Sequence, residues 1–177
     1  MSNNSAGTLR KQTVASVPAE TLWKTWTTTE GVTSFFAPKA NVEARVGGRY
    51  ELLFDLKAPR GFKGTEGCKV LNLNPPSNLS FEFLAPPEFP NARRVSTRVD
   101  VVIEQVFGGG LTKVNITHSG FLEGEEWDEC FQFFDWDWDL VLGRLQYQSY
   151  AGPIDWSRPY IPPGIGSRPL RKLRERV

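Results

Sequence analysis

The sequence predicts an α+β fold in which a curved antiparallel sheet wraps around one long C-terminal helix. Between residues 39 and 119, apolar side chains alternate with polar ones, and clusters of Gly, Pro and Asn interrupt the alternation at short intervals. This pattern is typical of consecutive antiparallel strands joined by turns. From about residue 125 to residue 150 the apolar side chains recur at helical spacing instead, and two shorter helical patterns precede the strands.

The length and composition of the chain are those of one globular domain. It has 177 residues, of which 40% are hydrophobic and 23% charged, and a chain of this size buries a core without a metal or a disulfide. We expect residues 8–150 to form the domain and residues 1–7 to be disordered. Residues 151–177 are expected to be an extension that packs on the long helix or on a partner, with a solvated basic end from Arg168 to Arg176.

Charge and hydropathy exclude several classes of function. The formal net charge of +1 argues against binding to nucleic acid or to an anionic membrane. No apolar run approaches the roughly 20 residues of a membrane-spanning helix, and the polar N-terminus lacks a secretory signal. Cys68 and Cys130 lie far apart and outside any metal-ligand spacing, which predicts two buried thiols. We therefore expect a cytoplasmic protein with no metal and no cofactor.

Two short helices are predicted after a first strand at residues 9–17. Pro18 closes that strand, and Pro18 followed by Glu20 is a favourable helix start. The second helix is capped by Thr29 and stops before Pro38. Their apolar positions are Leu22, Trp23 and Trp26 in the first helix and Val32, Phe35 and Phe36 in the second.

The sheet is predicted from a run of alternating segments. The expected strands, after a first segment around residues 42–44, are residues 50–56, 64–73, 79–83, 95–107 and 111–119. Residues 85–91 contain three prolines, which lack a backbone donor, so this segment is predicted to be a loop. Gly47-Gly48 lacks the Lys and Ser/Thr of a phosphate-binding loop, and we interpret it as a tight turn.

The long helix carries two apolar stripes. The first is expected to pack on the sheet and consists of Trp127, Phe131, Phe134, Trp138, Val141 and Leu145. The second consists of Phe133, Trp136, Leu140 and Tyr147. A helix that is apolar on two sides must be covered on both, and the sequence leaves two covers open. One is the segment after Tyr150, and the other is a second subunit in a homodimer through Phe133, Trp136 and Leu140.

Several segments carry a resemblance to a known superfamily. They are Val17 to Glu20 with Trp23 and Trp26, Val46 to Glu51, Gly67 to Pro76, Leu79 to Phe83, Thr112 to Phe121, and the helix from Trp127 to Tyr150. Their order resembles that of the START-related, Bet v allergen-like helix-grip (SRPBCC) superfamily. Within it, the chain is similar to the C-terminal domain of activators of the heat-shock-protein-90 ATPase, over roughly residues 8–150. The resemblance implies a helix-grip fold and a chaperone-linked role.

A pocket is expected between the short helices, the inner face of the sheet and the long helix, because a sheet that curls around a helix often leaves a hollow. The candidate lining residues are Trp26, Phe35, Phe36, Tyr50, Phe54, Phe81, Val99, Val101, His118, Phe131, Phe134 and Trp138.

Two polar features have competing interpretations. His118 is the sole histidine and shares a face with Val114 and Ile116, so it points inward. It either anchors a strand through hydrogen bonds or contacts a ligand as a catalytic base. Asp135, Asp137 and Asp139 alternate with tryptophans. On a helix, neighbours two residues apart diverge by about 200°, so we interpret the three as a solvated face and not as a metal cluster.

Three functions remain open from the sequence. The first is a binding protein for a small apolar molecule such as a lipid, a polyketide or an aromatic metabolite. The second, implied by the resemblance, is an interaction protein associated with a chaperone ATPase. The third is a cyclase- or dehydratase-type enzyme that uses His118. No nucleophile triad, metal set or cofactor motif accompanies the histidine, so the binding protein is preferred and no catalytic residue is assigned.

Overall fold

A computed structural model describes residues 7–106, 108 and 110–171. The expected disordered segment 1–7 falls almost wholly outside this range, as does the end of the basic tail. The chain forms a five-stranded antiparallel sheet with the order β1-β7-β6-β5-β4. These strands are β1 (Leu9–Ala15), β4 (Val70–Asn74), β5 (Asn78–Phe83), β6 (Thr97–Val106) and β7 (Leu111–Ser119). A separate hairpin pairs β2 (Lys39–Val42) with β3 (Tyr50–Leu53).

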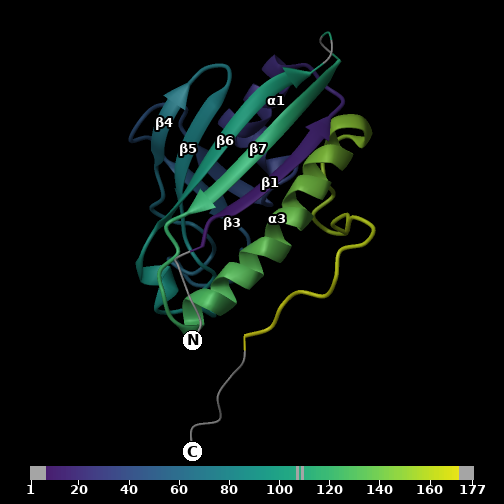
Figure 1. The fold of residues 1–177 in the computed structure, drawn as a ribbon. Helices are drawn as coiled ribbons and strands as arrows, with labels where there is room; N and C mark the ends of the chain where they lie inside the picture. Colours follow the sequence, from purple (N-terminus) through teal and green to yellow (C-terminus); the bar gives the residue numbers. More distant parts are fainter. Residues whose placement is uncertain (1–6, 107, 109, 172–177) are drawn as a thin grey trace, which may run out of the picture.

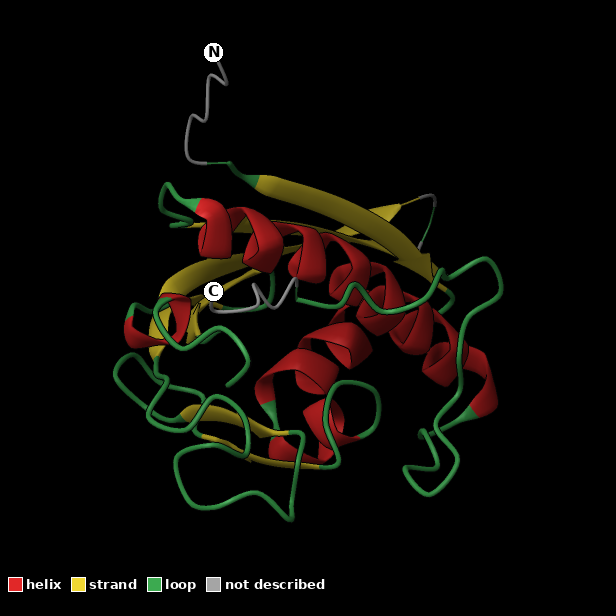
Figure 2. Cartoon of the chain, turned by 90° about the horizontal axis from the view of Figure 1, so that it is seen from below, coloured by secondary structure: helices red, strands yellow, loops and turns green. Residues whose placement is uncertain are grey.

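Among the described residues, three helices complete the fold. They are α1 (Ala19–Thr27), α2 (Thr29–Thr33) and α3 (Glu125–Ala151), and a single 3-10 turn, η1 (Ala92–Arg94), precedes β6. The hydroxyl of Thr28 caps α2 by accepting a hydrogen bond from the Gly31 N–H at 2.9 Å. Figure 2 shows α3 lying along one side of the sheet, with α1, α2 and the β2-β3 hairpin on that same side. The predicted α+β helix-grip architecture is confirmed.

The strands predicted at residues 50–56 and 64–73 are shorter in the structure. Strand β3 ends at Leu53, because the Asp55 carboxylate accepts hydrogen bonds from the Lys57 and Ala58 N–H groups and turns the chain. Strand β4 begins only at Val70. Before it, Gly64 lies so close to β3 that a Cβ there would be 1.9 Å from the Leu52 carbonyl oxygen. Residues 54–64 therefore form a loop that leaves the sheet, which we call the pocket loop.

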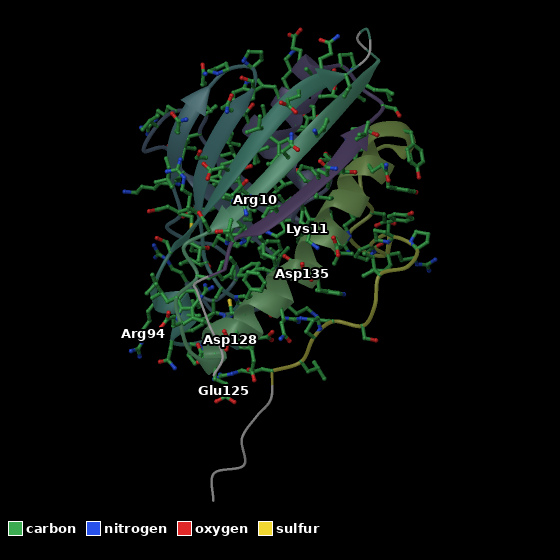
Figure 3. The ribbon with its side chains drawn as sticks, viewed as in Figure 1. Arg10, Lys11, Arg94, Glu125, Asp128 and Asp135 are labelled. Carbon is green, nitrogen blue, oxygen red and sulfur yellow. The ribbon has the colours of Figure 1, made fainter. Side chains whose placement is uncertain are left out.

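The sheet and α3 are joined by a bifurcated ion pair. Lys11 on β1 points toward α3, where Asp135 and Asp139 bind its ammonium group at 2.8 and 2.9 Å (Figure 3). Both carboxylates are half-exposed, so this face of α3 is the solvated one that the sequence predicts. Asp137 differs, because it points away from Lys11 to the other side of the helix, where the side chain lines a pocket.

The segment after α3 turns back and runs beside the helix (Figure 1). Near its start, the Trp156 Nε1–H donates to the Thr33 carbonyl at 2.7 Å, and Tyr160 stacks on Tyr147 of α3 at 3.9 Å. Gly143 gives the tail room, since a Cβ there would lie 2.3 Å from Pro162 Cγ. Further along, Arg171 binds Glu126 at 2.9 Å. The tail therefore contacts the second apolar stripe of α3 over much of its length.

Candidate functional site

A pocket of about 540 Å³ lies between the second stripe of α3, the pocket loop, the loop at residues 84–93 and the tail. Its apolar lining includes Phe54, Phe62, Phe133, Phe134, Trp136 and Leu140. Its charged lining consists of Asp55, Lys63, Glu88, Arg93, Asp137 and Arg168. A mostly apolar hollow with a few convergent polar groups is the usual form of a site for a small molecule.

The structure places most of the predicted lining residues elsewhere. Of the twelve candidates, Phe54 and Phe134 line this pocket. The others lie in the core between the sheet and the helices: Trp26, Phe35, Phe36, Tyr50, Phe81, Val99, Val101, His118 and Trp138 are buried, and Phe131 is half-buried. Their rings fill that space by packing on one another, as when Phe36 meets Trp138 edge-on at 5.6 Å. The pocket therefore lies one layer further out than the sequence predicts.

The second stripe of α3 forms the floor of the pocket. Phe133 and Leu140 are buried there, and Trp136 is half-buried. The tail reaches the same residues, because the Trp136 Nε1–H donates to the Gly166 carbonyl at 2.7 Å and the Arg168 guanidinium lies 5.0 Å from the centre of the Phe133 ring. A second subunit bound on this stripe would have to displace the tail.

Glu66 and Arg93 hold the walls of the pocket in place. The Glu66 carboxylate accepts hydrogen bonds from the backbone N–H groups of Gly61, Lys63 and Gly64. Burial alone would raise the pKa of Glu66, but these backbone donors outweigh burial and lower it. Arg93 donates to the carbonyls of Gly61 and Gly64 on one wall and to that of Ala85 on the other. The pocket loop is therefore fixed to the rest of the domain.

None of the charged lining residues is among the predicted ones, and Asp137 is the one that projects from the floor of the pocket. Burial of its carboxyl group raises the pKa to about 7, although the charges of Arg144 and Arg168 act in the opposite direction. The signal was present in the sequence, because Asp137 follows Phe133 by four residues and precedes Leu140 by three. This spacing places Asp137 on the second stripe, on the side of the helix that lines the pocket. The alternation with tryptophans does not indicate this.

His118 is held on both sides within the core. The Trp138 Nε1–H donates to His118 Nδ1 at 3.0 Å, and His118 Nε2 lies 2.7 Å from the Thr97 hydroxyl, which in turn donates to the Phe83 carbonyl at 3.1 Å. With Nδ1 as an acceptor, the neutral ring carries its proton on Nε2. Burial lowers the pKa of His118 to about 3. This geometry matches the interpretation of His118 as a strand anchor.

Other reactive side chains also lie in the core. The Tyr50 hydroxyl donates to the Trp26 carbonyl at 2.8 Å, and burial raises its pKa. Cys68 and Cys130 are free and buried, as predicted, and burial raises the pKa of each thiol to about 12. Within residues 7–106, 108 and 110–171, no three His, Cys, Asp or Glu side chains group as a metal site would require. No helix in that same part of the chain has the length and hydropathy to cross a membrane.

The architecture defines a helix-grip protein, with an antiparallel sheet closed by a long C-terminal helix. The family model described as activator of Hsp90 ATPase homolog 1-like protein matches residues 16–146, and the chain belongs to this family. The resemblance found in the sequence is thereby confirmed. The comparison with curated proteins yields no match.

Solved structures share the fold at low sequence identity. The Aha1 dimer from Colwellia psychrerythraea is 17% identical over 82% of this chain and 98% of that chain, with a TM-score of 0.63. CalU16 from Micromonospora echinospora is 15% identical over 86% of this chain and 79% of that chain, with a TM-score of 0.58. DynU16, a protein in the dynemicin biosynthetic locus, is 16% identical over 82% of this chain and 48% of that chain, with a TM-score of 0.60.

Proposed function

We propose that this chain binds a small, mainly apolar molecule, such as a lipid, a polyketide or an aromatic metabolite, in the pocket beside α3. The observation that carries the proposal is the pocket itself. Its volume of about 540 Å³ falls within the range of roughly 300–1,000 Å³ that is usual for sites of small ligands. Its floor is the aromatic and aliphatic stripe of α3, and its walls are fixed by Glu66 and Arg93.

The structural relatives add support of a limited kind. DynU16, described as a protein in the dynemicin biosynthetic locus, shares this fold. A fold hosts many functions, so this likeness supports the class of ligand and not its identity. The enzyme alternative has less support, because His118 bonds to Thr97 and Trp138 and is not among the residues that line the pocket.

Filling the pocket is expected to weaken ligand binding. We expect an uncharged aromatic probe, N-phenylnaphthylamine, to bind the full chain, and the Leu140→Trp variant to bind it at least about tenfold more weakly, because the larger side chain occupies the pocket floor. Isothermal titration calorimetry measures the affinity, and thermal melting followed by circular dichroism confirms that each variant is folded.

The matched control is the same substitution at an exposed leucine. Leu122 is 48% exposed and does not line the pocket, so Leu122→Trp is expected to leave the affinity unchanged. Should Leu140→Trp disturb the fold, Phe62→Ser serves instead, because Phe62 lines the pocket from an exposed position. Equal affinities in folded pocket and control variants would contradict the proposal.

A second candidate is stimulation of a chaperone ATPase, which the family match favours. In this case we expect the full chain to raise the ATPase rate of an Hsp90 homologue in a concentration-dependent way, and Leu140→Trp to raise it equally, since surface contacts would carry the effect. A coupled ATPase assay measures the rate. No rise at saturating concentrations of the chain would remove this candidate.

We do not propose a homodimer through Phe133, Trp136 and Leu140, because the tail contacts this stripe.

A further inference from the structure

We infer that the pocket selects apolar molecules that carry a hydrogen-bond donor, above all a protonated amine, and that Asp137 accepts this donor. The inference rests on the proposed function and specifies which ligands the same pocket prefers. Asp137 lies on the floor of the pocket, one helical turn after Phe133 and one before Leu140, and all three side chains line it. The carboxylate is therefore placed among apolar groups, facing the space that a ligand would occupy.

The part of the chain that the structure describes leaves the bonding capacity of this carboxylate unused. Among the residues that the structure describes, none places a donor or an ion-pairing group within bonding distance of Asp137. Its neighbours on α3 do have such partners, since Asp135 and Asp139 both bind Lys11. A carboxylate in apolar surroundings gains more from a hydrogen-bonded cation than it would in water. The arrangement therefore favours a ligand that brings the missing donor.

Most other charged groups around the pocket already have partners. Arg168 binds Glu88 at 2.8 Å, and Asp55 accepts hydrogen bonds from the pocket loop. Arg93 donates to three backbone carbonyls and lies 3.6 Å from Glu66. Lys63, on the pocket loop, makes no side-chain hydrogen bond or ion pair with the residues that the structure describes. Its long side chain reaches water without leaving the loop, whereas Asp137 sits on a rigid helix.

The two arginines near Asp137 do not replace a ligand donor. Arg144 directs its Nε–H to the Tyr160 carbonyl at 2.9 Å and stacks over Trp156, and Arg168 is held by Glu88. Both charges lower the pKa of Asp137, yet burial still raises it to about 7. The surroundings thus leave the charged form poorly compensated, and a bound ammonium group would compensate it directly.

Three probes with one apolar body and different head groups test the inference. Phenylbutylamine, phenylbutanol and phenylbutyrate are titrated into the full chain by calorimetry, at a pH of about 8 where Asp137 is largely ionised. We expect the amine to bind at least about tenfold more tightly than the carboxylate, with the alcohol between them. The Asp137→Asn variant, which keeps the size of the side chain, is expected to weaken amine binding by about tenfold or more. Asp139→Asn, two residues away and outside the pocket, is the matched control and should leave the affinity for the amine unchanged.

The outcomes separate this inference from the proposed function. Equal binding of the three probes, a preference for phenylbutyrate, or unchanged amine binding in Asp137→Asn would overturn the inference and leave an apolar-ligand pocket in place. If none of the probes binds and N-phenylnaphthylamine does not bind either, both proposals fall together. A loss of amine binding in Asp139→Asn as well as in Asp137→Asn would also overturn the inference, because it would indicate a general effect of charge.

Discussion

Acidification from pH 7 to pH 4 is expected to lower the free energy of unfolding by about 3 kcal/mol through His118 alone. In the folded chain, burial lowers the pKa of this histidine from its usual value of 6.5 to about 3. Between these two values the unfolded chain binds a proton and the folded chain does not. The stabilisation is therefore complete above pH 6.5 and declines as the pH falls toward 3. Protonation in the folded state would also require Nδ1 to give up the hydrogen bond from Trp138.

A variant comparison isolates this contribution, because other groups titrate in the same range. Burial raises the pKa of Asp137 to about 7, so that group favours folding at low pH and opposes it as the pH rises. His118→Gln removes the titration at position 118 and leaves the other groups in place. Urea denaturation at pH 7 and pH 4 measures the free energy of unfolding of both proteins. On acidification, we expect the wild type to lose about 3 kcal/mol more than His118→Gln loses. Parallel losses in the two proteins would contradict the assignment.

The fold could be predicted from the sequence because its signals are local and repeated. The period of two over the strands and the helical spacing after Gly120 are set by the residues themselves. The element boundaries depend on contacts that no local pattern contains. Strand β4 begins at Val70 and not at Gly64, because the preceding residues are bound by the Glu66 carboxylate and pressed against Leu52.

The candidate site was harder to predict, because its position depends on how completely the core is filled. The aromatic candidates other than Phe54 are buried or half-buried, yet their rings pack on one another, as Tyr50 does on Phe81 at 4.0 Å. The pocket lies instead between α3, the pocket loop and the loop at residues 84–93. Periodicity does not encode the lengths and paths of loops. The sequence does predict the second stripe of α3, but as a surface covered by the segment after Tyr150 or by a second subunit and not as the floor of a pocket.

Replacing Trp26 by alanine is expected to lower the free energy of unfolding by about 3–5 kcal/mol, whereas replacement by phenylalanine should have a much smaller effect. Trp26 is fully buried and packs edge-on against the rings of Phe35 and Phe36, with centroid distances of 5.0 and 5.9 Å. Its Nε1–H is buried and has no hydrogen-bond partner among the described residues. A phenyl ring retains much of the packing and removes this unsatisfied donor, whose burial opposes folding by about 1–3 kcal/mol.

Trp138 supplies the matched comparison for this experiment. It is equally buried, but its Nε1–H donates to His118, so Trp138→Phe removes a satisfied donor and leaves the histidine Nδ1 without one. We expect Trp138→Phe to be less stable than Trp26→Phe by at least about 1 kcal/mol, although both variants lose the same atoms. Chemical denaturation at pH 7 measures both. Equal losses would show that ring volume alone sets the stability at these positions, and that the bond between Trp138 and His118 contributes nothing measurable.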